Sequence, residues 1–179
     1  MAKVATSVRE IELPQGTTAT IADGVVTVKG PKGTLTRDCR ASGVDLAVED
    51  GSIIVRADLP RRKEKALVGT FGAHIANMVR GVNKEFEFTL KTVFSHFPIK
   101  AKVDGQALLI ENFLGERYPR HAPILPDTKV QVKGDQITVS GANREHVGQT
   151  AANIEHATKV KRRDVRVFQD GIYITSRGR

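Results

Sequence analysis

The sequence contains one strand–turn–strand pattern twice, first as Val48-Glu49-Asp50-Gly51-Ser52-Ile53-Ile54-Val55 and again as Val132-Lys133-Gly134-Asp135-Gln136-Ile137-Thr138-Val139. A helical pattern follows each stretch, with Val68-Gly69 in the first copy and Val147-Gly148 in the second. An Asp-Gly pair between strand-like runs precedes each, at Asp23-Gly24 and Asp104-Gly105. Three matches in the same order indicate two copies of one unit, at about residues 8–94 and 98–176.

Most of each unit is expected to be β-structure. Val26 and Val28 alternate with their neighbours as the residues of a half-buried strand do, and so do Ile53 and Val55. Asp-Gly pairs between apolar runs predict tight hairpins, and they begin at Asp23, Asp50, Asp104 and Asp170.

One helix is expected in each unit. Pro60 suits the first turn of the first helix, and Gly81 suits a stop near its end. Asn143 suits the N-cap of the second helix. The predicted apolar stripes comprise Leu67, Phe71, Ile75, Met78 and Val82 in the first helix, and Val147, Ala151 and Ile154 in the second.

Runs of strands with a single helix each predict an α+β fold. We expect two tandem duplicated domains, each a mostly antiparallel β-sheet unit covered by one α-helix. The expected boundaries are residues 1–97 for the first unit and 98–179 for the second. The join is Ser95-His96-Phe97-Pro98, where Pro98 disfavours a helical conformation at Phe97.

The charge balance points to a polyanionic partner. The 179 residues include 28 Lys and Arg against 20 Asp and Glu, which gives a net charge of +8 and a pI near 9.8. Nucleic acid is the first candidate, and an acidic membrane surface is the second. No apolar run approaches the ~18 residues of a membrane span, and residues 1–6 lack the apolar core of a signal peptide. The single Cys39 excludes an intramolecular disulfide and suits a reducing cytosol.

Catalytic and metal-binding patterns are missing from the sequence. It contains no G-x-S-x-G, H-E-x-x-H or EF-hand loop. Gly30-Pro31-Lys32-Gly33 lacks the ending of a phosphate-binding P-loop and is interpreted as a tight turn. His146 and His156 point in different directions on one helix and do not converge on a metal. No enzyme activity, cofactor, metal or small-molecule substrate is therefore expected.

Positive charge gathers in the C-terminal segment. Its core follows a helix and precedes a strand, so it should form an exposed connection that can reach phosphates. A solvated basic loop is the alternative. The candidate RNA-binding residues of this segment are Lys159, Lys161, Arg162, Arg163 and Arg166, together with Arg177 and Arg179 at the end of the chain.

Two further clusters are candidates. Arg117, Tyr118, Arg120 and His121 interleave aromatic and basic residues in a turn-like segment, which suits stacking and phosphate contacts with RNA. Near the start of the first helix, cations oppose the helix dipole unless RNA or the nearby Asp58 and Glu64 compensate them, and both possibilities stay open. This third cluster comprises Arg61, Arg62, Lys63 and Lys65.

Several strings resemble the large-subunit ribosomal protein six family. The first half supplies Val28-Lys29-Gly30-Pro31-Lys32-Gly33-Thr34-Leu35 and Asn77-Met78-Val79-Arg80-Gly81-Val82, and the second supplies Val147-Gly148-Gln149-Thr150-Ala151-Ala152. Asn112-Phe113-Leu114-Gly115-Glu116 and Arg166-Val167-Phe168-Gln169-Asp170-Gly171-Ile172-Tyr173-Ile174 resemble its archaeal and eukaryotic branch. The Tyr-Lys-Gly-Lys-Gly string of the bacterial branch is absent from the sequence.

The resemblance implies a structural, non-catalytic protein of the large ribosomal subunit, bound to the ribosome in the cytoplasm. It implies contact with large-subunit ribosomal RNA, mainly through the second domain, beside the sarcin–ricin loop and near the base of the factor-recruiting stalk. Neighbouring ribosomal proteins are implied as partners. By position, Lys159, Lys161, Arg162, Arg163 and Arg166 replace the bacterial RNA-binding string and inherit its role. The alternative function is an extra-ribosomal RNA-binding module.

Overall fold

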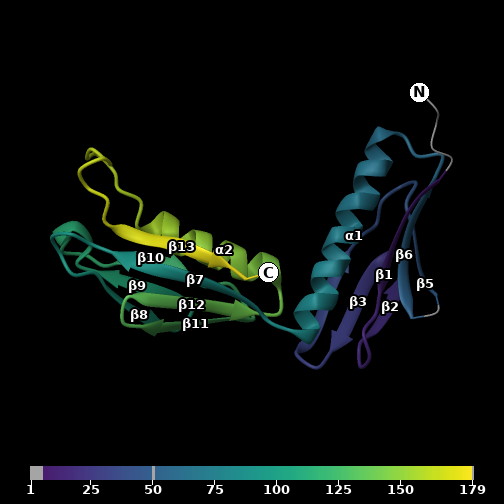
Figure 1. The fold of residues 1–179 in the computed structure, drawn as a ribbon, viewed down its shortest axis with the longest axis horizontal. Coiled ribbons are helices and arrows are strands. Elements are labelled where there is room, and N and C mark those ends of the chain that lie inside the picture. The colour runs from purple at the N-terminus through teal and green to yellow at the C-terminus, as the bar shows by residue number, and fades with distance from the viewer. Residues whose placement is uncertain (1–5, 50, 179) are drawn as a thin grey trace. The chain divides into compact units, whose positions relative to one another are not determined.

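The computed structural model describes residues 6–49 and 51–178, and the chain separates into two compact units, Met1–Glu85 and Phe86–Arg179 (Figure 1). Every pair of neighbouring strands in the described residues runs antiparallel. One α-helix packs against strands of both sheets in each unit. The expected α+β class and the tandem duplication are therefore confirmed.

The first unit consists of two three-stranded sheets and one helix. The sheets have the orders β1-β6-β5 and β2-β3-β4. The strands are β1 (Thr6–Glu12), β2 (Thr18–Ala22), β3 (Val25–Gly30), β4 (Gly33–Asp38), β5 (Asp45–Glu49) and β6 (Ser52–Asp58), and the helix is α1 (Arg62–Asn83).

The second unit repeats this order and adds one strand. Its sheets have the orders β11-β12-β7-β13 and β10-β9-β8. The strands are β7 (Phe86–Val93), β8 (Lys100–Asp104), β9 (Ala107–Glu111), β10 (Arg120–Pro123), β11 (Thr128–Lys133), β12 (Gln136–Gly141) and β13 (Gly171–Arg177). The helices are the short 3-10 turn η1 (Phe113–Gly115) and α2 (Arg144–Ala157).

The boundary between the units differs from the expected join after residue 97. Strand β7 corresponds to β1 of the first unit, because each pairs with the second strand of the quoted pattern: Ile11 lies opposite Ile53, and Leu90 lies opposite Ile137. β7 also lies between β12 and β13 in the sheet of the second unit. The second copy therefore begins at β7, before the proline that suggested the join.

Three of the four predicted Asp-Gly turns fall between paired strands. Asp23 and Gly24 both have positive φ, 48° and 74°, as a two-residue hairpin of the I′ type requires. The β8–β9 hairpin turns at Gly105, with Asp104 still in its strand. Gly51 turns the β5–β6 hairpin, and Asp50 lies outside the described residues. The prediction at Asp170 is wrong: this residue is 1% exposed and immediately precedes β13 after a long connection.

Both predicted helices are present, but the ends of the first differ from those that Pro60 and Gly81 suggested. Pro60 precedes the N-cap of α1 at Arg61, and Gly81 is buried inside the helix, which continues to Asn83. At α2, Asn143 is the N-cap as predicted, and its Oδ1 accepts a hydrogen bond from the amide of Glu145 at 3.0 Å.

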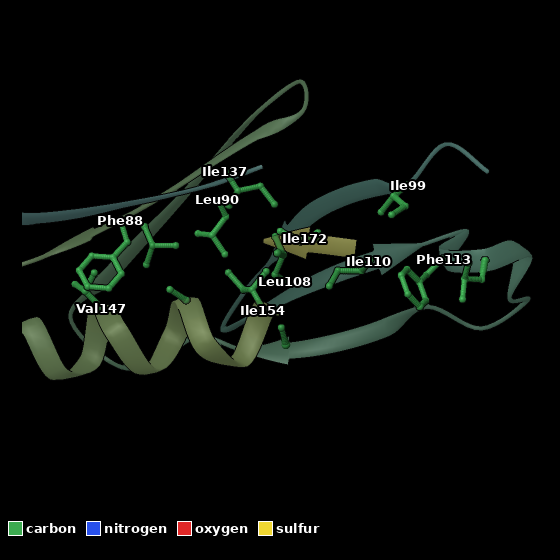
Figure 2. Close-up of a cluster of buried hydrophobic side chains, with 14 residues drawn as sticks. Phe88, Leu90, Ile99, Leu108, Ile110, Phe113, Ile137, Val147, Ile154 and Ile172 are labelled. Carbon is green, nitrogen blue, oxygen red and sulfur yellow. The ribbon is translucent and has the colours of Figure 1, made fainter. Parts of the chain in front are cut away.

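Each unit has its own apolar core. Figure 2 shows the core of the second unit, in which side chains of β7, β9, β12 and β13 meet α2. Phe113 of η1 belongs to the same core. In the first unit, Ile75 and Val82 of α1 are fully buried, whereas Leu67 and Phe71 are only partly buried. The buried face of α1 therefore includes Val68, Gly72 and Val79 beside the predicted stripe.

Candidate nucleic-acid interface

Residues 158–170, here called the basic connection, join α2 to β13 and are mostly exposed. Asp164 gives the connection its turn: its carboxylate Oδ1 accepts from the amide of Arg166 at 2.9 Å, and its carbonyl accepts from the amide of Phe168 at 2.9 Å. Arg162 has a φ of 58°, in the left-handed region. The guanidinium of Arg163 lies 4.8 Å from the centre of the Phe168 ring. The expected exposed connection is thus present, with a defined shape.

Residues 112–119, here called the η1 loop, hold the second predicted cluster. Asn112, Leu114 and Gly115 all have positive φ, so the chain coils tightly before it reaches β10. Arg117 is exposed, and Tyr118 is 79% exposed. Both side chains are available at the surface of the second unit.

Arg120 joins the η1 loop to the basic connection. Its Nε and Nη2 donate to the two carboxylate oxygens of Glu116 at 2.8 and 2.6 Å. Its Nη1 donates to the carbonyl oxygens of Ala157 and Lys159 at 2.8 and 3.1 Å. The guanidinium also lies 4.2 Å from the centre of the Phe113 ring. Arg120 is therefore occupied by protein groups and positions the two segments that carry the other basic residues.

The ion pair at Arg120 changes the acidity of Glu116. The hydrogen bonds from Arg120 are the main cause that lowers the pKa of Glu116, and the charge of Arg163 acts in the same direction. The charge of Arg163, in the basic connection, therefore acts on a carboxylate of the η1 loop. The two basic clusters, which are well separated in the sequence, form one surface at the end of the second unit where β13 begins (Figure 1).

Other predicted site residues lie elsewhere. His121 is exposed, but it alternates with Arg120 and Ala122 along β10 and so faces the opposite side of the strand. Arg177 ends β13, whereas the basic connection leads into its beginning, so the length of the strand separates them. Arg179 lies outside the described residues.

The cluster at residues 61–65 belongs to the first unit. A carboxylate oxygen of Glu64 accepts from the amide of Arg61 and so caps the start of α1. Asp58 is instead paired with Arg56 at 2.9 Å. Arg62, Lys63 and Lys65 lie in the first turn of α1, and Glu64 is the nearby acid that acts on the helix start.

The other chemical candidates have structural surroundings. Gly30-Pro31-Lys32-Gly33 forms the predicted turn between β3 and β4, and the amide of Lys32 donates to the carbonyl of Val82 at 2.8 Å. Cys39 is buried, and that burial raises the pKa of its thiol. Within residues 6–49 and 51–178, no cluster of three His, Cys, Asp or Glu side chains could hold a metal. Neither described α-helix is both long enough and apolar enough to cross a membrane.

The sequence did not reveal the groups that shape this surface. The η1 loop and the basic connection are held in place by Glu116, Asp164 and Phe168. In the sequence, however, an acidic residue within a basic segment looks like an interruption of the positive charge. These residues lie within five positions of the arginines that they contact, and this short spacing is the sequence feature that could have identified them.

Comparison with known proteins gives one consistent family. The family model described as Ribosomal protein L6 matches residues 13–85 and 97–171. The protein named large ribosomal subunit protein uL6 of Methanobrevibacter smithii is 49% identical over 175 residues, which cover 97% of this chain and 98% of that protein. The uL6 protein of Methanosarcina mazei is 50% identical over 169 residues, covering 94% of this chain and 96% of that protein.

Proposed function

Because this chain belongs to the ribosomal protein L6 family, we propose that it is a structural constituent of the large ribosomal subunit and binds large-subunit ribosomal RNA through its second unit. The proposed location is beside the sarcin–ricin loop and near the base of the factor-recruiting stalk. Neighbouring large-subunit proteins are its further partners. Its role is to hold RNA, without catalysis.

One observation carries the proposal for the second unit: Arg120 fixes the η1 loop against the basic connection. The exposed Arg117 and Tyr118 thereby share a surface with Lys159, Lys161 and Arg162. Cations neutralise phosphates, and an exposed aromatic ring can stack on an unpaired base. A surface fixed in this way loses little conformational entropy when RNA binds.

The first experiment measures the salt dependence of RNA binding. Lys161→Gln, Arg162→Gln and Arg163→Gln are combined, and the affinity for a large-subunit ribosomal RNA fragment is measured at several salt concentrations. The slope of log K against log salt should fall by about 0.7–0.9 for each phosphate that the variant no longer neutralises. The matched control combines Arg62→Gln, Lys63→Gln and Lys65→Gln, which remove the same charge from the first unit.

A change of slope in the control and none in the connection variant would assign the principal RNA surface to the first unit. Unchanged thermal unfolding of both variants is required, because Arg163 also packs on Phe168.

The alternative is an extra-ribosomal RNA-binding module built on the same repeat. Sedimentation separates the two functions: a structural constituent should stay with mature large subunits at high salt. Release of the chain at low salt, together with binding to unrelated RNA, would favour the alternative.

A further inference from the structure

The basic connection encloses a cavity of about 320 Å³ against the C-terminal end of α2. Its apolar wall includes Val160, Val165 and Phe168, and Tyr173 adds a second ring. Val165 is 63% exposed and Tyr173 is 42% exposed, so the cavity opens to solvent. Its volume lies at the lower end of the ~300–1,000 Å³ typical of small-molecule sites.

Hydrogen bonds hold the walls of this cavity in place. The Thr158 hydroxyl is buried, donates to the Glu155 carbonyl at 3.1 Å and accepts from the Ile172 amide at 3.0 Å. The Tyr173 hydroxyl donates to the Gln169 carbonyl at 3.0 Å, and the Gln169 Nε2 donates to the Arg166 carbonyl at 3.3 Å. The cavity is therefore formed before any ligand arrives.

The lining combines two aromatic rings with hydrogen-bond acceptors and one cation. Glu155, whose Oε1 already accepts from the Ile174 amide at 3.3 Å, retains a second carboxylate oxygen as an acceptor, and the carboxamide oxygen of Gln169 is another. The exposed Lys159 provides a cation at the edge. Such a lining suits a flat ring that carries amino and carbonyl groups and is attached to an anion.

We propose that this cavity receives one unpaired nucleobase of the RNA that the basic connection binds. The inference rests on the proposed RNA-binding function and adds a base-recognition site to it. The base stacks on Tyr173 beside the apolar wall of Val160, Val165 and Phe168, its edge meets Glu155 and Gln169, and its phosphate lies toward Lys159. The cation of Lys159 at the edge of the cavity favours this occupant over an apolar side chain of a protein partner.

The test uses the full chain and two probes of equal charge. One probe is a short single-stranded RNA, and the other has the same length and backbone without bases. The wild-type chain should bind the base-bearing strand about 5- to 140-fold more tightly, as expected for stacking of one base. Tyr173→Ala should remove most of this preference, and Tyr173→Phe should keep it because the ring remains.

Phe94→Ala is the matched control, since it removes a ring of similar exposure, 40%, from the same unit at a position outside the proposed RNA surface. Loss of the preference in this control and its retention in Tyr173→Ala would overturn the inference. Equal binding of both probes by the wild-type chain would also overturn it while leaving charge-driven RNA binding intact. Failure to bind either probe would contradict the proposed RNA-binding function itself.

Discussion

Arg120 was predicted as an RNA contact because it stands beside Arg117 and Tyr118 in the sequence. In the structure its guanidinium donates to Glu116 and to the carbonyls of Ala157 and Lys159. Sequence reasoning pointed to this segment from its local composition, but the contacts of the Arg120 side chain reach residues 37 and 39 positions away. No local pattern contains that information.

We predict that Arg120→Lys weakens the second unit although it keeps the positive charge. A lysine cannot provide the planar fork that contacts Glu116 and two carbonyl groups at once. The free energy of unfolding should fall by about 1–3 kcal/mol, as measured by urea denaturation. Arg117→Lys, at an exposed position, is the control and should change stability little. Equal stability of both variants would mean that Arg120 is not a brace.

The lowered pKa of Glu116 predicts a pH-dependent contribution to stability. A carboxyl group whose pKa is lower in the folded state stabilises the fold above its unfolded pKa, and this contribution disappears as pH falls through its folded pKa. Glu116→Gln should therefore destabilise the chain at pH 7, and this effect should begin to shrink near the ordinary glutamate pKa of about 4.3 and be lost at an acid pH below the lowered folded pKa. Urea unfolding at both pH values checks this, with Glu111→Gln correcting for the lost charge. A difference that persists unchanged in acid would contradict the assignment to the Arg120 pair.

At the scale of elements, the apolar spacing predicted both helices and part of their buried faces. Ile75, Met78 and Val82 are buried as expected, but Phe71 is only partly buried. The difference arises because α1 contacts strands of two sheets, so its buried face is wider than one stripe and is completed by Val68 and Gly72. The position of a helix on two sheets is a tertiary property, which the spacing of apolar residues does not specify.

We predict that Ile75→Ala lowers the free energy of unfolding of the first unit by about 2–5 kcal/mol, because it leaves a cavity in a fully buried position. Phe71→Ala should cost less, although it removes more atoms, since Phe71 is partly exposed. Hydrogen exchange resolves the effect by unit, and Ile154→Ala serves as the matched change in α2. An equal loss of protection in both units after Ile75→Ala would show that they unfold together.

At the scale of the whole molecule, the repeat predicted two copies of one unit but not where the second begins. Pro98 suggested the join, whereas the structure divides the chain after Glu85. The first copy shows why the join lies earlier. There β6, the second strand of the repeated pattern, pairs with β1 at the start of the copy. The corresponding strand β12 pairs with β7, so the second copy also needs a strand before Pro98.

We predict that residues 86–179 fold alone and that residues 98–179 do not. The shorter fragment lacks β7, which lies between β12 and β13, and so loses the pairing that joins them. Circular dichroism and hydrogen exchange distinguish the fragments. Residues 86–179 should also bind a ribosomal RNA fragment more tightly than residues 1–85 at the same salt concentration, because their positive charge is concentrated on one surface. A well-folded fragment 98–179, or tighter RNA binding by residues 1–85, would contradict these expectations.

Strand β13 completes one edge of the sheet in the second unit, whereas β1, at the matching edge of the first unit, pairs with no strand other than β6 among the described residues. The registers make Arg9 of β1 the counterpart of Phe88 in β7, since Arg9 lies opposite Val55 and Phe88 opposite Val139. An open strand edge invites pairing with other chains and aggregation, and a charged side chain on its inner face opposes this. The same edge is therefore finished differently in the two copies: the second adds a strand, and the first carries Arg9, whose Nη1 donates to the Gly69 carbonyl of α1 at 3.5 Å.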